Sequence, residues 1–237
     1  MLVIPRLDRG MTKMENIMNH AITILIYSAL PIGAIHTLTG PDHYVPFIAL
    51  SKARQWSMLK TTLITLLCGI GHVVSAVVLG LLGVALGYTL TKISFIADFR
   101  NNIAAWVLIG FGFAYFLWGL RVAFKKQRHQ HFHLVGHAHK KSWKELTPWL
   151  LFIVFVLGPC EQLIPLIMYP AIKGLFFDVF VIALLFGIAT IVTMLSVVTM
   201  SVYGTHLIKI KFLEKYGQAT AGAVICSVGI VIKAFGL

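Results

Sequence analysis

The chain has 237 residues, of which 58% are hydrophobic and only 12% are charged, and its mean hydropathy is +0.87. A soluble domain carries about 25% charged residues, so this composition excludes a soluble globular class and predicts a protein of the lipid bilayer. The net charge of +12 does not indicate a nucleic-acid partner, because Lys and Arg fall mainly in short links between apolar runs, as cytoplasmic loops require. We therefore expect contact with membrane lipid and none with nucleic acid.

Six apolar runs follow a polar start. We assign residues 1–20 to an N-terminal extension and expect no fixed structure there. Lys and Arg concentrate in the links after the first, third and fifth runs, so these links should face the cytoplasm and both termini should lie outside. The sequence predicts an all-α membrane protein with six transmembrane helices. The runs that can cross about 30 Å of hydrocarbon at about 1.5 Å per residue lie at 21–51, 59–88, 103–124, 148–172, 178–205 and 217–236.

The two halves of the chain resemble each other. The spacing that carries Gly40-Pro41 onto Gly158-Pro159 also carries residues 66–75 onto 184–193, where apolar and small residues coincide. Because each half holds three spans, an odd number, the second copy must insert upside down, and the Gly-Pro pairs predict broken first and fourth helices. We therefore expect two inverted three-helix repeats, at 21–124 and 148–237, joined by a His-rich cytoplasmic loop at 125–147.

The first apolar run is interrupted by the sequence His-Thr-Leu-Thr-Gly-Pro-Asp-His, which begins at His36. Ionisable side chains are costly in hydrocarbon and usually mark a pathway or a site. On an unbroken helix His36 and His43 would lie about 10 Å apart, too far to share one ion. Gly40 and Pro41 break the helix, so its halves can bring His36 toward Asp42 and His43. The segment predicts a divalent-cation site; the alternative is an ordinary Gly-Pro-Asp turn at the membrane surface.

The fourth run repeats the break at Gly158 and Pro159 and adds a thiol and a carboxyl, Cys160 and Glu161. A thiol at the start of a half-helix forms its thiolate readily, and a thiolate is a soft metal ligand. Glu161 can be a ligand, a proton carrier or a structural residue, and the sequence leaves these roles open.

His72 lies near the middle of the second run, beside Gly69 and Gly71, which permit close helix approach. Cys68 precedes it by four positions and Ser75 follows by three, so the three side chains share a helix face. Because His72 belongs to the duplicated segment, we interpret it as a site residue; the alternative is a packed histidine bonded to a carbonyl. The odd number of cysteines, all in apolar runs, argues against a disulfide framework.

The third link contains five histidines at alternating spacing, a composition typical of a transition-metal chelator. We predict that it captures or senses metal, and the alternative is a merely basic cytoplasmic loop. The five residues are His129, His131, His133, His137 and His139.

The His-Thr-Leu-Thr-Gly-Pro-Asp-His segment, the Gly-Ile-Gly-His segment of the second run and the His-rich link resemble the nickel/cobalt transporter superfamily, particularly its urease-accessory-type membrane branch. The resemblance covers the six-span body and leaves out the N-terminal extension. It implies transport of nickel or cobalt through the bacterial cytoplasmic membrane, with a metallochaperone or a urease or hydrogenase maturation system as partner. It also implies that the functional residues are His36, Asp42, His43 and His72.

The wider superfamily is also similar to the membrane part of thiol–disulfide electron carriers of cytochrome c maturation, whose first and fourth spans each carry a Pro-Cys pair. Cys160 fits that pattern, whereas its register partner in the first half is Asp42. Further alternatives are a sulfite or anion exporter of the same architecture and a metal sensor that transports nothing. An anion exporter should line its cavity with Arg or Lys, and neither lies near the motifs of runs one, two and four.

The resulting hypothesis is a secondary carrier of a divalent transition-metal cation, with Ni²⁺ or Co²⁺ as cargo, no required cofactor and no enzymatic reaction. We expect His36, Asp42, His43 and His72 to bind the ion near the membrane midplane. Cys160 and Glu161 would complete or gate that site from the second half of the chain.

Overall fold

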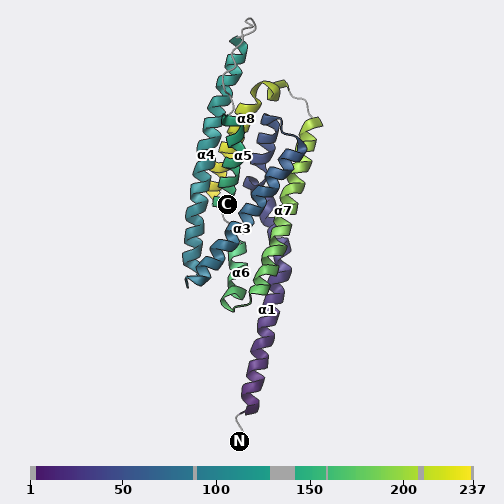
Figure 1. Cartoon of the computed structure of the whole chain (residues 1–237), viewed down its shortest axis with the longest axis vertical. Coiled ribbons are helices and arrows are strands. Elements are labelled where there is room, and N and C mark those ends of the chain that lie inside the picture. Colours follow the sequence, from purple (N-terminus) through teal and green to yellow (C-terminus); the bar gives the residue numbers. More distant parts are fainter. Residues whose placement is uncertain (1–3, 88–89, 129–141, 159, 208–210, 236–237) are drawn as a thin grey trace.

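The computed structural model describes residues 4–87, 90–128, 142–158, 160–207 and 211–235, and within these ranges it contains helices and no strand (Figure 1). Five helices hold segments long and apolar enough to cross a membrane. The chain is therefore an all-α, multi-pass membrane protein, and the many apolar side chains on its outer surface contact lipid. The five segments are Glu15–Thr39, Met58–Ala85, Thr91–Phe124, Phe176–Gly204 and Tyr216–Phe235.

The elements follow the order of the predicted runs but differ from them in several bounds. Helix α1 begins at Ile4, whereas we expected no fixed structure before residue 21. The physical reason is that each residue added to a helix that has already formed gains one backbone hydrogen bond. The predicted run 148–172 is divided between two helices that are each too short to cross a membrane alone, so the six-helix inverted repeat stays a prediction. In chain order the elements are α1 Ile4–Thr39, η1 Pro41–His43, α2 Val45–Arg54, α3 Met58–Ala85, α4 Leu90–Arg128, α5 Ser142–Leu157, α6 Leu163–Ile172, α7 Phe176–Leu207 and α8 Lys211–Phe235.

The first helix break lies at Gly40. Its backbone is extended, with φ −90° and ψ 100°, and Pro41 then opens the short 3₁₀ helix η1. Pro41 has no N–H to continue the helical ladder, which is why α1 ends at Thr39. The Gly40 N–H still bonds the His36 carbonyl oxygen at 3.0 Å, so the last turn of α1 remains closed.

Helix α3 lies at the centre of the packing, in contact with α5, α6 and α7, while α1 packs on α7 and α4 packs on α8 (Figure 1). Its buried positions recur every three or four residues, as expected for one face of a helix. This face carries the side chain of His72 inward, toward α5 and the break after α1. The buried residues on this face include Thr61, Thr65, Cys68, His72, Ala76 and Gly80.

Helices α4 and α8 approach so closely that glycine is required at their contact. A β-carbon added at Gly112 would lie 2.4 Å from the backbone nitrogen of Cys226, whereas one added at Gly110 would meet no atom within 4 Å. We predict that Gly112→Ala lowers the free energy of unfolding by about 1–3 kcal/mol, because the two backbones must separate. Thermal unfolding in detergent measures this, with Gly110→Ala as the matched control; equal melting temperatures for the two variants would contradict the close contact.

Candidate functional site

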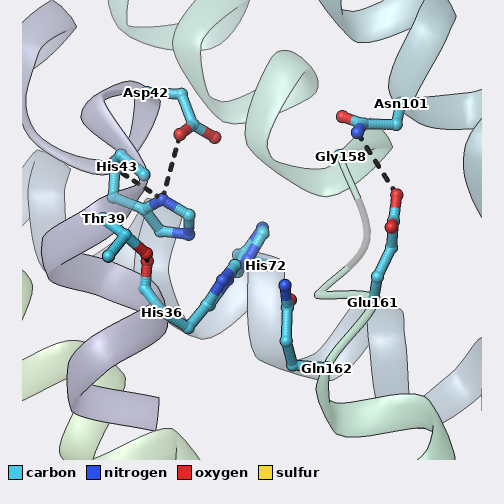
Figure 2. Close-up of a pocket in the computed structure, with 10 residues that line it drawn as sticks. His36, Thr39, Asp42, His43, His72, Asn101, Gly158, Glu161 and Gln162 are labelled. Carbon is cyan, nitrogen blue, oxygen red and sulfur yellow. Dashed lines mark hydrogen bonds and ion pairs between the residues drawn. The ribbon is translucent and has the colours of Figure 1, made fainter. Parts of the chain in front are cut away.

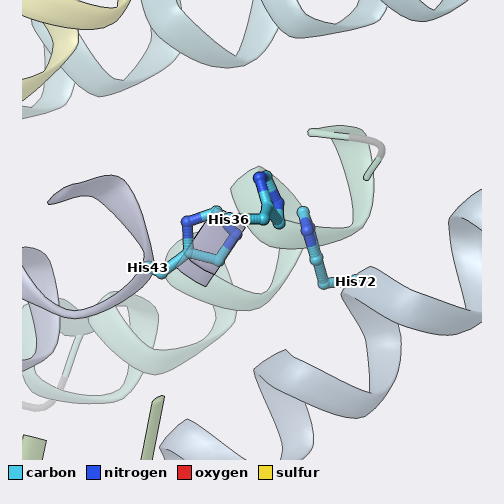
Figure 3. A group of neighbouring side chains, drawn as sticks. All are labelled: His36, His43 and His72. Carbon is cyan, nitrogen blue, oxygen red and sulfur yellow. The ribbon is translucent and has the colours of Figure 1, made fainter. Parts of the chain in front are cut away.

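Three histidines meet beside the first helix break (Figure 3). His36 lies in the last turn of α1, His43 in η1 and His72 in the middle of α3. The ring centroids of His36 and His43 are 4.6 Å apart, and those of His43 and His72 are 5.0 Å apart. One potential ligand atom from each ring lies within 4.8 Å of the other two. His43 and His72 are buried and His36 is half-buried, so this cluster lies inside the helix bundle.

Hydrogen bonds fix the tautomers of two of these rings. His72 Nδ1 lies 3.2 Å from the carbonyl oxygen of Phe155, in the last turn of α5. A carbonyl oxygen only accepts, so Nδ1 donates its proton there and Nε2 holds the lone pair. His43 Nδ1 lies 3.2 Å from the carbonyl oxygen of Gly40 and 3.2 Å from Asp42 Oδ1, which assigns the same tautomer.

The Nε2 atoms of His36, His43 and His72 are buried and have no hydrogen-bond partner among the residues that the structure describes. Leaving a buried nitrogen unpaired is costly, and each such group calls for an explanation. Metal-binding imidazoles are usually held in this way, with the other ring N–H bonded to a carbonyl or a carboxylate. The three free nitrogens are therefore suited to a cation or to water.

The histidines line a pocket of about 110 Å³, enough space for roughly three or four water molecules (Figure 2). The opposite wall combines α4 of the first half with the second helix break, and there Asn101 Nδ2 donates a hydrogen bond of 3.2 Å to Glu161 Oε1. None of the described lining residues is Lys or Arg, so the pocket offers an anion no cationic side chain. The lining residues are His36, Thr39, Gly40, Asp42, His43, His72, Asn101, Gly158, Glu161 and Gln162.

The predicted residues of the second break are placed differently from one another. Gly158 and Glu161 line the pocket, opposite Asp42. Cys160 does not line it: its side chain is fully buried in a hydrophobic cluster with Val73 and Phe186. Cys68 is also buried, but in another cluster, with Phe47 and Met194, and the described cysteines are all free thiols. Pro159 and the five histidines of the third link lie outside the residues that the structure describes.

Sequence reasoning missed the contribution of α4. We placed the start of the third span at residue 103, which assigned Arg100 and Asn101 to the outer link, yet α4 begins at Leu90. Arg100 donates a hydrogen bond of 2.6 Å to the carbonyl oxygen of Val156, one of the carbonyls left without a helical partner at the end of α5. The adjacent polar residues before the third apolar run were the only signal available.

The arrangement has the chemistry of a cation site. Nitrogen ligands bind Zn²⁺ at about 2.0–2.1 Å, which places two of them about 3.4 Å apart in tetrahedral geometry. The potential ligand atoms lie within 4.8 Å of one another, so the rings would have to draw closer to share one ion. Asp42 supplies a carboxylate beside the imidazoles and orients His43.

A comparison with known families identifies a relationship that the sequence analysis gave only as an alternative. The family model described as "Cytochrome C biogenesis protein transmembrane region" matches residues 43–231. The searches of curated proteins and of solved structures found no significant match. The resemblance to the nickel/cobalt transporter superfamily therefore indicated the wrong family. The prediction of nickel or cobalt transport, which depended on it, is also wrong. The match favours the alternative, the thiol–disulfide class of cytochrome c maturation.

Proposed function

Because the chain belongs to the family of cytochrome c biogenesis protein transmembrane regions, we propose that it is a membrane-embedded thiol–disulfide electron carrier in cytochrome c biogenesis. The observation that carries this proposal is the family match, which runs from His43 at the first helix break to residue 231 in α8. It begins just after the first break and includes the second break with Cys160 and the pocket wall formed by α3 and α4.

Cys160 is the thiol that we assign to this role. It lies at the second break, next in sequence to Glu161, whose carboxylate lines the histidine pocket. The other two cysteines lie within the continuous helices α3 and α8. Because Cys160 is fully buried, a thiol or disulfide reaches it only when the packing around it opens transiently.

A single thiol can pass two electrons from a donor dithiol to an acceptor disulfide. The Cys160 thiol loses its proton, and its sulfur attacks the acceptor disulfide, whose S–S bond breaks as a mixed disulfide forms. A donor thiol then attacks the Cys160 sulfur and releases the acceptor with both thiols reduced. The second donor thiol closes the donor disulfide and restores the Cys160 thiol, so two electrons and two protons have moved from donor to acceptor.

Glutathione disulfide tests this reactivity without the physiological partner. In the full chain carrying Cys68→Ser and Cys226→Ser, only Cys160 remains, and we predict that one glutathione adds and is removed by dithiothreitol. Intact-protein mass measures the adduct, with Cys160→Ser in the same background as the control. The contradicting outcome is that Cys160 forms no glutathione adduct after hours with glutathione disulfide in reconstituted liposomes, although a small maleimide labels it. The thiol would then be accessible without exchanging, and the proposal would fail.

A second function is favoured by the three unpaired imidazole nitrogens. We propose that the pocket binds a transition-metal cation of the kind that imidazole ligands suit, such as Zn²⁺ or Cu²⁺. His36, His43 and His72 would supply nitrogen ligands, and Asp42 would stabilise the bound charge. Glu161 stands on the opposite wall as a further carboxylate, and the His-rich link would deliver or buffer the ion.

The packing pattern supports the inverted repeat as part of the proposal. If α1 corresponds to α5, α2 to α6, α3 to α7 and α4 to α8, a two-fold axis exchanges the contact of α1 with α7 for that of α5 with α3, and the contact of α2 with α7 for that of α6 with α3. The contacts of α3 with α7 and of α4 with α8 map onto themselves. These contacts are expected of two inverted repeats.

We further propose that the protein lies in the bacterial cytoplasmic membrane. The basic residues of the links place the ends of α2, α4 and α7 inside the cell and both termini outside.

A further inference from the structure

An apolar cavity lies between α3 and α5 on the lipid-facing surface. Its volume is about 240 Å³, larger than the roughly 150 Å³ of an apolar cavity that holds benzene. Leu67 and Trp149, on its rim, are 58% and 65% exposed, so the cavity opens to the bilayer. We call it the α3–α5 groove, and the residues that line it are Ile64, Leu67, Cys68, Pro148, Trp149 and Phe152.

The groove is closed at its inner end. The two helices run in parallel, because the groove joins earlier residues of both and the bond of His72 to Phe155 joins later ones. A β-carbon added at Gly71 would lie 2.9 Å from the Phe152 ring and 3.0 Å from the Val156 side chain, so the helices touch just beyond the groove. The groove and the histidine pocket share no lining residue among those described. The groove is therefore a separate site.

The depth of the groove is that of the acyl chains of one leaflet. Helix α3 has 28 residues, which at about 1.5 Å per residue span about 42 Å, the thickness of a bilayer with its headgroups. Its first turn, from Met58, therefore lies among headgroups. Ile64 stands about 9 Å and Cys68 about 15 Å from that end along the helix axis, inside the hydrocarbon of the leaflet beside the α2–α3 link.

A lysine stands above the groove at the level of the headgroups. Lys60 is exposed and precedes Ile64 by four residues, so both lie on the same face of α3. Its Nζ lies 5.6 Å from the centre of the Trp56 ring, which attracts the ammonium and holds it beside the apolar surface. The α2–α3 link and α3 contain no Asp or Glu, so this face offers a positive charge to an anionic headgroup.

An acyl chain suits the shape of the groove better than a protein helix does. The lining residues of α3, from Ile64 to Cys68, span only about 6 Å of the helix axis, whereas membrane helices pack over several turns through small residues. The opposite wall consists of the rings of Trp149 and Phe152, whose centroids are 6.2 Å apart and whose planes are nearly perpendicular. These bulky rings hold a helix backbone away and leave room for a narrow, flexible chain.

We propose that the α3–α5 groove binds an anionic phospholipid of the leaflet beside the α2–α3 link. One acyl chain fills the groove, and the phosphate accepts hydrogen bonds from the Lys60 ammonium. A zwitterionic lipid binds more weakly, because its own cation neutralises the phosphate. The site uses neither thiol exchange nor a bound metal, so it is separate from the functions proposed above.

Lipid titration of the purified full chain in detergent, followed by native mass spectrometry, tests the headgroup. The two probes are phosphatidylglycerol and phosphatidylcholine with the same oleoyl chains. We predict that one phosphatidylglycerol binds about fivefold more tightly than phosphatidylcholine, and that Lys60→Gln removes this preference. Lys173→Gln, which removes an exposed charge after α6, should retain it. Equal affinities of the two lipids for the wild type, or an unchanged preference in Lys60→Gln, would overturn the proposal.

A second variant tests the groove itself. Leu67→Trp puts a larger ring on the rim, and we predict that it weakens phosphatidylglycerol binding about tenfold by occupying the space of the acyl chain. Leu63→Trp is the matched control, because Leu63 is 48% exposed on the same helix and does not line the groove. Equal phosphatidylglycerol affinities for these two variants would show that no acyl chain lies in the groove.

Discussion

Cells in which Cys160 is replaced by serine are expected to lose covalently bound haem from their c-type cytochromes. The physical reason is that the hydroxyl of serine cannot form the mixed disulfide through which the electrons pass, while its size preserves the packing of the second break. Haem staining of membrane proteins after denaturing electrophoresis measures the loss, in cells whose only copy of the gene carries the change. Covalent haem survives denaturation, so the stain reports completed cytochromes.

Cys226→Ser is the matched control for this prediction. Cys226 is only half-buried and lies on α8, where its backbone contacts α4 at Gly112. It takes no part in the pocket, so we expect normal haem staining. Equal staining for wild type, Cys160→Ser and Cys226→Ser, at equal amounts of each protein, would refute the role of Cys160 and leave the metal site as the function to pursue.

Replacing His72 by alanine is expected to weaken Cu²⁺ binding to the pocket by about 100-fold or more, because it removes one of three nitrogen ligands. It also leaves the Phe155 carbonyl oxygen without its donor. Electron paramagnetic resonance of the Cu²⁺-loaded full chain counts the bound nitrogens. The protein used should carry alanine at all five histidines of the third link, which would otherwise compete for the ion.

Ser75→Ala tests whether a smaller change on the same helix has the same effect. The Ser75 hydroxyl bonds the His72 carbonyl oxygen at 2.9 Å, one turn beyond the pocket, and its loss should leave Cu²⁺ affinity and the nitrogen count unchanged. If His72→Ala binds Cu²⁺ as tightly as Ser75→Ala does, the three histidines are packed residues and hold no metal.

A local motif was an unreliable guide to the family of this protein. The segment from His36 to His43 suggested a nickel/cobalt transporter, but the match that identifies the family extends over residues 43–231 and so rests on the pattern of whole helices. Intramembrane histidines and aspartates serve several functions, because their cost in hydrocarbon marks a site without specifying its chemistry. The metal proposal therefore rests on the geometry of the ring nitrogens, and the resemblance adds nothing to it.

The sequence by itself determined the membrane class, the helical architecture and the position of the first break. These properties depend on composition and on neighbours in the chain: long apolar runs cross a bilayer, and a Gly-Pro pair ends a helix wherever it stands. His36, Asp42 and His43 could be singled out for the same reason, since all three flank that break.

Only the tertiary structure decided which side chains share the pocket. The packing of α3 against α5 brings His72 to the Phe155 carbonyl, and α4 places Asn101 against Glu161. The same packing turns Cys160 into a hydrophobic cluster and leaves Thr65 without a partner among the described residues. Such contacts join residues that are far apart in the chain, and the periodicity of a single helix gives its buried face but does not identify what that face meets.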